Sequence, residues 1–167
     1  MDEFKRYGIT KKRMLDKDFI TRFVAFRIHT LQEYKPSLDN FLNTSMARLK
    51  SLSIKEREQI KADFKKALQV AWDIFGEYAY RKQYSMRDKK KPFNKALFES
   101  WNIALYRLKE EEIKIVIEKK IILIKKFIKL LNEDKEFEKS ISSSTSGRKH
   151  VEKRFSSIEN LIKEALK

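Results

Sequence analysis

Apolar side chains recur every three or four residues along most of this chain, which is the spacing of one face of an α-helix. The longest such run covers residues 54–78, and the sharpest covers residues 113–131, where lysines are interspersed among the apolar positions. The chain contains only 3 Gly and 2 Pro, too few for an architecture of many strands and tight turns. The pattern therefore predicts an all-α fold, a single-domain mixed helical bundle of about six to seven helices.

Capping residues place several of the predicted helix ends. Asp16 can cap the first helix and Ser37 the second, because a side-chain oxygen at the N-cap accepts a free backbone N–H. Ser53 and Glu56 have the spacing of a capping box at the start of the long helix. Gly76 falls inside the apolar pattern of that helix, where a glycine indicates close packing or a kink.

Three segments depart from the helical pattern. The N-terminal residues 1–12 are basic and weakly patterned, residues 83–91 are polar and basic, and residues 137–147 are rich in serine and threonine with one glycine. We therefore expect a basic N-terminal arm over residues 1–15 and a helical domain over residues 16–167. Within that domain we expect a basic loop and a hydroxyl-rich loop.

The composition excludes several classes of site and location. The chain has no cysteine, which excludes disulfides, thiolate nucleophiles and zinc–sulfur sites. Charged residues interrupt the most apolar run, so none is long enough to cross a bilayer and we expect no membrane partner. The N-terminus is charged and lacks a signal-peptide core. A cytoplasmic location fits these features best.

The formal net charge is +15, from 39 Lys and Arg against 24 Asp and Glu. A surface of this charge attracts polyanions, chiefly nucleic acid. The lysines fit equally the solvated faces of helices in a lysine-rich protein. Arg22 and Arg27 lie beside aromatic stripes and are either packed against the rings or available to phosphates. The sequence leaves both pairs of interpretations open.

The first candidate for nucleic-acid contact is the hydroxyl-rich loop together with the start of the helix that follows it. Free backbone N–H groups and the helix dipole favour anions at a helix N-terminus. Hydroxyls and cations gather at the same place in this sequence. The residues of this candidate are Ser144, Thr145, Ser146, Arg148, Lys149, Lys153 and Arg154.

The second candidate is the basic loop. Tyr78, Tyr80 and Tyr84 alternate there with cations, and exposed tyrosines can stack on bases of a single strand. The same tyrosines are also placed to complete the core stripe of the preceding helix, and both interpretations stay open. The cationic residues of this candidate are Arg81, Arg87, Lys89, Lys90 and Lys91.

Residues able to carry catalysis or to bind a metal are few. His29 and His150 lie far apart and neither has a second ligand at helical spacing, so we predict no metal site. Glu99 lies on a predicted helix, where a lone carboxylate is either a general base or a salt-bridge partner. The Gly-x-Ser-x-Gly motif and a Walker-type glycine loop are both absent. We therefore predict no catalytic residue, no cofactor and no enzyme activity for this chain.

Several residue blocks, in this order and spacing, resemble the C-terminal half of the domain-of-unknown-function family 262. That family is similar to the ParB/sulfiredoxin-like nuclease–NTPase half of GmrSD-type modification-dependent restriction systems. The resemblance covers nearly the whole chain. It rests on Arg13-Met14, Arg22-Phe23-Val24-Ala25-Phe26-Arg27, Tyr34 to Asn43, Phe75-Gly76, Asn94 to Glu99, Ser140-Ile141-Ser142, Thr145-Ser146 and Arg154-Phe155.

The departures from the family decide what the resemblance implies. The Asp-Gly-Gln-Gln-Arg type of motif, which the family carries in its N-terminal half, is absent from this sequence, and so is an HNH motif. The resemblance therefore implies the helical C-terminal portion alone, with a supporting role. We expect a non-catalytic accessory domain that contacts DNA. The alternative is an interaction module that docks on an N-terminal nuclease-like domain or a companion protein, or self-associates, without binding DNA.

Overall fold

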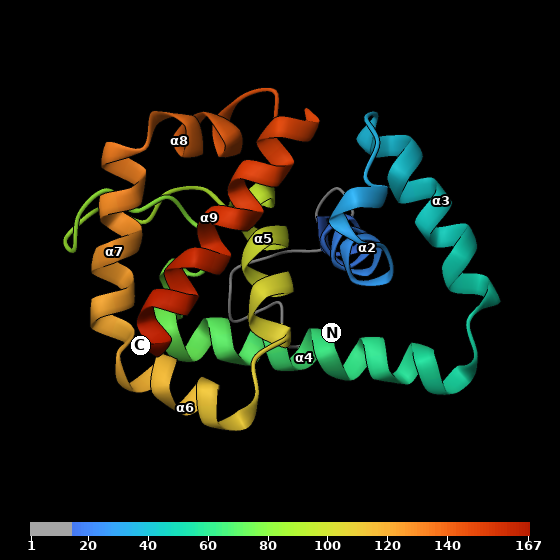
Figure 1. Cartoon of the computed structure of the whole chain (residues 1–167), viewed down its shortest axis with the longest axis horizontal. Helices are drawn as coiled ribbons and strands as arrows, with labels where there is room; N and C mark the ends of the chain where they lie inside the picture. The colour runs from blue at the N-terminus through green and yellow to red at the C-terminus, as the bar shows by residue number, and fades with distance from the viewer. Residues whose placement is uncertain (1–14) are drawn as a thin grey trace.

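The computed structural model describes residues 15–167, which form eight α-helices and two short 3₁₀ helices without a β-strand (Figure 1). This confirms the predicted all-α fold, and the described residues form a single domain. The predicted basic arm falls outside them, except that Leu15 begins the first helix. The elements are α2 (Leu15–Ile28), η2 (Leu31–Glu33), α3 (Leu38–Ser51), α4 (Ile54–Phe75), η3 (Gly76–Tyr78), α5 (Lys95–Tyr106), α6 (Glu110–Glu118), α7 (Lys120–Glu133), α8 (Lys135–Ser142) and α9 (Arg148–Leu166).

Within residues 15–167 the structure has more α-helices than the six to seven predicted, for two reasons. The run predicted as one helix breaks at Lys119, whose φ of −88° and ψ of 16° separate α6 from α7. The first part of the predicted hydroxyl-rich loop is also helical. The Asp134 side chain accepts the N–H of Phe137 and caps α8. Phe137 and Ile141 then bury one face of this short helix.

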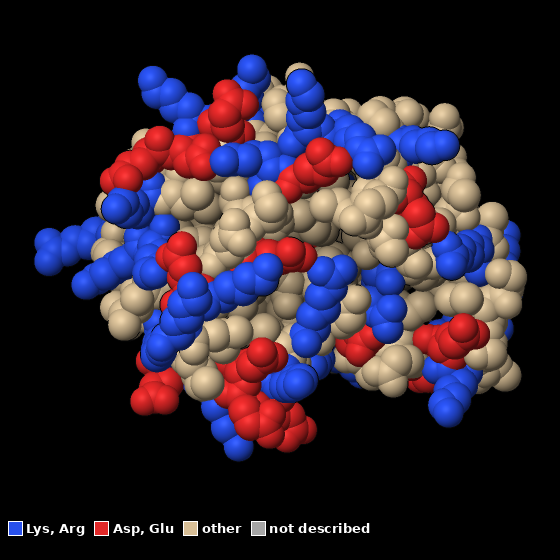
Figure 2. All heavy atoms as spheres, viewed as in Figure 1, with Lys and Arg blue, Asp and Glu red and all other residues tan. Residues whose placement is uncertain are grey.

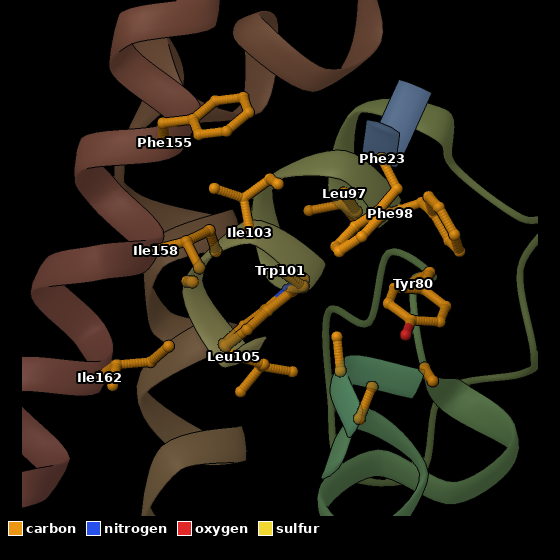
Figure 3. Close-up of a cluster of buried hydrophobic side chains, with 14 of the residues drawn as sticks. Phe23, Tyr80, Leu97, Phe98, Trp101, Ile103, Leu105, Phe155, Ile158 and Ile162 are labelled. Carbon is orange, nitrogen blue, oxygen red and sulfur yellow. The ribbon is translucent and has the colours of Figure 1, made fainter. Parts of the chain in front are cut away.

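Helix α5 lies at the centre of the bundle. All of its residues from Ala96 to Leu105 are buried, as expected for a helix that is packed on every side. Figure 3 shows Phe155 and Ile158 of α9 facing α5, with Phe23 of α2 on another side of it. The long α4 runs along the lower edge of Figure 1, and α3 and α7 form its two lateral edges. Burial of aromatic rings around α5 therefore holds the bundle together.

Aromatic contacts join α5 and α9 to the helices around them. The rings of Phe26 in α2 and Phe155 in α9 lie 4.8 Å apart between centroids. Phe75 at the end of α4 lies 4.8 Å from Trp101 in α5, and the same tryptophan lies 5.4 Å from Phe127 in α7. Pairs at these separations add roughly 0.5–1.5 kcal/mol each beyond the apolar area they bury.

The predicted caps of α3 and α4 are confirmed. Ser37 accepts the N–H of Asn40, and Ser53 accepts the N–H of Glu56 at 3.2 Å. The Glu56 carboxylate in turn accepts the Ser53 N–H at 2.8 Å, which completes the capping box. Asp16, predicted as a cap, lies instead in the first turn of α2, where its charge still suits the helix dipole.

Gly76 ends α4 rather than lying inside it, so the prediction of a kink or close packing there is wrong. Its φ is +54° and its ψ is −130°, a conformation that residues with a Cβ rarely adopt. A Cβ at this position would meet no atom within 4 Å. The backbone conformation, not space, therefore requires glycine.

We predict that Gly76→Ala lowers the free energy of unfolding by about 1–3 kcal/mol, because alanine strains the backbone at positive φ. Urea unfolding followed by circular dichroism measures the change. Gly147→Ala is the matched control, because Gly147 has a φ of −66° and its nearest neighbour to a new Cβ is 3.4 Å away. The control should lose less than about 1 kcal/mol. Equal losses in the two variants would contradict this account.

Candidate functional site

The hydroxyl-rich loop between α8 and α9 consists of residues 143–147 and turns sharply into α9. Ser144 has a φ of +49°, and its carbonyl accepts the N–H of Gly147 at 3.0 Å and the Nδ1–H of His150 at 2.8 Å. Gly147 is the N-cap of α9 and offers no side chain to the first turn. The first N–H groups of α9 therefore lack a side-chain cap, and Ser144 and Ser146 are exposed beside them.

Two buried side chains hold this loop from inside. The Tyr34 hydroxyl donates to the carbonyl of Ser146 at 2.6 Å, and Arg154 Nη1 donates to the carbonyl of Thr145 at 2.6 Å. The exposed fraction of Tyr34 is 0% and that of Arg154 is 1%. Burial raises the pKa of Tyr34, which keeps its hydroxyl protonated and able to donate. The backbone of the loop is therefore fixed by residues that solvent does not reach.

The prediction that Arg154 contacts a phosphate at the surface is wrong, because Arg154 is buried. Its guanidinium forms a buried ion pair with Glu99 through Nη2. Arg154 follows Val151 by three residues and precedes Phe155 and Ile158, so it lies on the apolar face of α9. That position is the signal in the sequence that could have placed Arg154 in the core.

Glu99 binds a second arginine as well. Its other carboxylate oxygen accepts from Arg22 Nη1 at 3.2 Å, and Arg22 Nε in turn donates to Asp18 at 3.1 Å. Lys95 completes the group with its ammonium 2.7 Å from Asp18. We call these five residues, from α2, α5 and α9, the buried ion cluster after its buried pair, Glu99 and Arg154, whereas Lys95 at its outer end is exposed.

The pKa values in the buried ion cluster follow from a balance of burial and charge. Burial is the largest influence on Asp18 and would raise its pKa, but Lys95 and Arg22 together lower it. Burial would likewise lower the pKa of Arg22, and Glu99 and Asp18 together raise it. Asp18 and Arg22 are therefore charged near neutral pH.

The buried ion cluster answers two questions that the sequence left open. Both oxygens of Glu99 are bonded to arginines, and its exposed fraction is 0%, so it is a salt-bridge partner and is not placed to act as a general base. Arg22 is partly buried and paired with Asp18 and Glu99, so its guanidinium is not available to a phosphate. Arg27 pairs with Asp63 at 2.8 Å and lies over the ring of Tyr106, which favours its packing interpretation too.

Five residues from separate parts of the sequence meet at this point. Arg22, Tyr34, Glu99, Thr145 and Arg154 join α2, α5 and α9 to the loop at residues 143–147. These residues therefore hold the fold and the loop.

The remaining cations of the first candidate are at the surface but differ in their partners. Arg148 pairs with Glu152 at 2.8 Å and Lys153 pairs with Asp134 at 2.7 Å. Lys149 is exposed and forms no ion pair within residues 15–167. Exposed ion pairs contribute little, roughly 0–1 kcal/mol, so a phosphate can compete for Arg148.

Fewer cations of the basic loop are free to bind phosphate than the sequence predicted. Arg81 donates to the carbonyls of Glu77 at 3.1 Å and Lys91 at 2.6 Å, and its guanidinium lies over the ring of Phe93. It therefore joins the two ends of the basic loop and is not free to bind phosphate. Lys90 pairs with Glu77, and Lys91 pairs with Asp88.

Two cations of the basic loop remain available to a ligand. Arg87 and Lys89 are exposed, and neither forms an ion pair in the part of the chain that the structure describes. These two residues are what the structure leaves of the second candidate.

The tyrosines of the basic loop fix it in place. Tyr80 is buried and donates to Asn102 Oδ1 at 2.8 Å, and Tyr78 donates to the carbonyl of Asp88 at 2.9 Å. Tyr84 donates to Glu138 in α8 at 3.2 Å. The core interpretation is confirmed for Tyr80, and the hydroxyls of the other two are engaged within the domain.

A cluster of Lys82, Glu138 and Ser142 attaches the basic loop to α8. The ammonium of Lys82 lies 2.9 Å from Glu138 and 2.5 Å from the Ser142 hydroxyl. Bonds from Ser142 and Lys82 lower the pKa of Glu138, so a carboxylate pairs with the ammonium. The Ser142 hydroxyl itself donates to the Glu138 carboxylate at 2.6 Å. The cluster therefore clamps the basic loop to α8.

The two candidate segments both adjoin α8. The basic loop contacts α8 through Lys82 and Tyr84, and the last residue of α8 leads directly into the hydroxyl-rich loop. Figure 2 shows Lys and Arg over the whole visible face, interleaved with Asp and Glu. On that face the excess charge is dispersed instead of concentrated in one patch.

A metal site and a membrane-spanning helix are both absent from residues 15–167. No group of three or more His, Cys, Asp or Glu side chains converges there as a metal site would require. None of the described helices is long and apolar enough to cross a membrane.

No family model, curated protein or solved structure matches this sequence.

We predict that Glu99→Gln lowers the free energy of unfolding by about 3–5 kcal/mol, because it leaves the buried guanidinium of Arg154 without a carboxylate and leaves Arg22 with Asp18 alone. Urea unfolding at neutral pH measures the loss. Glu152→Gln is the matched control, since it removes the partner of an arginine on the surface, and should cost less than about 1 kcal/mol. A cost below about 1 kcal/mol for Glu99→Gln would show that the cluster does not stabilise the fold.

Proposed function

We propose that this chain is a non-catalytic helical accessory domain of a DNA-targeting protein of the restriction or defence type. In this proposal it contacts the nucleic-acid backbone through the hydroxyl-rich loop and the first turn of α9. The observation that carries the proposal is the exposed start of α9, where Lys149 without an ion pair in the described part of the chain adjoins backbone N–H groups that no side chain caps.

The chemistry of this place suits a phosphate diester. Backbone N–H groups at a helix N-terminus donate to anions, and the helix dipole adds a partial positive charge. Ser144 and Ser146 can donate further hydrogen bonds from hydroxyls. Contacts of this kind position a protein on the backbone without reading the sequence of bases.

The net charge of +15 supports attraction to a polyanion over a distance of about a Debye length. Arg87 and Lys89, on the basic loop that adjoins α8, offer a second contact on the same molecule of DNA. The restriction or defence setting, and the absence of activity in the chain itself, rest on the family resemblance and on the missing Asp-Gly-Gln-Gln-Arg type of motif. A cytoplasmic location is part of the same proposal.

A second candidate is an interaction module that docks on a nuclease-like domain or companion protein without binding DNA. One observation favours it: ion pairs within the domain occupy Arg148, Lys153, Lys90 and Lys91. Together with the burial of Arg154, these pairs leave fewer free cations than the sequence predicted.

We predict salt-sensitive binding of short duplex DNA, measured by fluorescence anisotropy between 50 and 200 mM salt, roughly the range over which phosphate contacts lose most affinity. Removing Arg148 and Lys149 together as glutamines should weaken binding. It should also reduce the slope of log K against log salt by about 0.9 for each phosphate that the variant no longer neutralises. Arg87→Gln with Lys89→Gln tests the second segment in the same way.

The matched control is Arg57→Gln with Lys61→Gln, which removes the same charge from exposed positions on α4. If all three double variants lose affinity equally, only net charge attracts DNA and the assigned surface is wrong. If the unaltered chain does not bind DNA at 50 mM salt, roughly the lower end of this range, the nucleic-acid proposal fails and the docking role stands in its place.

A further inference from the structure

Helix α7 exposes apolar side chains that nothing in the described domain covers. Ile121 and Ile122 are 49% and 52% exposed, although the opposite face of the same helix buries Leu123, Phe127 and Leu131 in the core. Burial of these two half-exposed isoleucines against a partner would be favourable. Helix α7 lies on the left of Figure 1, at the side of the bundle away from α3.

Lysines surround the two isoleucines. Ile122, Lys125 and Lys129 follow one another at spacings of three and four residues and so share one face of α7. Residues 118–133 contain five lysines and two glutamates, a difference of +3. Lys125 is exposed and forms no ion pair within the described part of the chain, and Lys129 reaches Glu133 only at 3.7 Å. We call the surface of Ile121, Ile122, Lys125 and Lys129 the α7 face.

We infer that the α7 face docks an amphipathic, acidic helix of a partner protein. Such a helix would place apolar side chains on Ile121 and Ile122, and carboxylates one and two turns further along, against Lys125 and Lys129. Charge complementarity of this kind favours encounter and fixes the register of two helices. The inference rests on the docking role proposed above and does not require the domain to bind DNA.

Charge also argues against two other occupants. A second copy of this chain docked face to face would oppose lysines with lysines, which is unfavourable. An anionic membrane would attract the lysines, but the face offers only two apolar side chains for insertion, and α7 ends on the acidic Glu133.

The test uses the whole chain and a fluorescent helical peptide of leucine, alanine and glutamate, about 16 residues long so that it covers the length of α7, with leucine at every third or fourth position. A scrambled peptide of the same composition has the same charge without the apolar stripe. Binding of the ordered peptide, with at least tenfold weaker binding of the scrambled one, is the expected result.

Two variants locate the binding surface. Ile121→Gln with Ile122→Gln should weaken binding of the ordered peptide at least tenfold, and Lys125→Gln with Lys129→Gln should weaken it and reduce its salt dependence. Ile54→Gln is the matched control for the first, because Ile54 is 76% exposed on a different helix. The control should bind like the unaltered chain, and all variants should keep the same helical circular dichroism.

Several results would overturn the inference. They are equal binding of both peptides, equal loss in the Ile54→Gln control, and binding of phosphatidylserine vesicles without binding of the ordered peptide. Dimerisation that Ile121→Gln with Ile122→Gln abolishes would assign the face to a second copy and would also overturn it. The DNA affinity of the isoleucine variant should equal that of the unaltered chain, so this inference and the nucleic-acid proposal can fail separately.

Discussion

The arrangement of the described helices depends on the carboxylate of Glu99, which lies in the core between Arg22 and Arg154. Apolar burial is non-directional, although close packing resists movement of the helices. The buried ion pair adds a directional constraint, because Arg154 separated from Glu99 would be left uncompensated in the protein interior. The cluster therefore constrains how α2, α5 and α9 sit against one another, while the aromatic core supplies most of the stabilisation.

The same interaction determines the shape of the candidate nucleic-acid surface. Arg154 reaches from the cluster to the carbonyl of Thr145, and Tyr34 reaches from the far side to the carbonyl of Ser146. Carbonyls that would otherwise repel an anion are thus occupied by buried donors. The hydroxyl-rich loop can then present N–H groups and hydroxyls to solvent while its backbone stays fixed. The buried side chains of Arg154 and Tyr34 thus fix the polar surface at the start of α9.

Helix α8 and its neighbours separate two surfaces of different chemistry. The start of α9 is polar and suited to phosphate, whereas the α7 face combines two exposed isoleucines with lysines. Lys82 clamps the basic loop to α8 between them. Because the surfaces share no residue, contact with a nucleic acid and contact with a partner protein are compatible in one domain. The high net charge serves both, since DNA and an acidic helix are both anionic.

Patterns along the chain are enough to predict the all-α class, the caps at Ser37 and Ser53, and the position of the basic loop, because these features depend on residues close in sequence. The break at Lys119 and the short helix α8 lie beyond such patterns, since α8 is stabilised by burying Phe137 and Ile141 against other helices. The availability of each cation is settled in three dimensions. Arg154 and Lys149 both read as surface cations beside a hydroxyl-rich loop, yet one lies in the core and the other in solvent. Arg154 is buried because it pairs with Glu99, which is remote in sequence and comes close only in the folded chain.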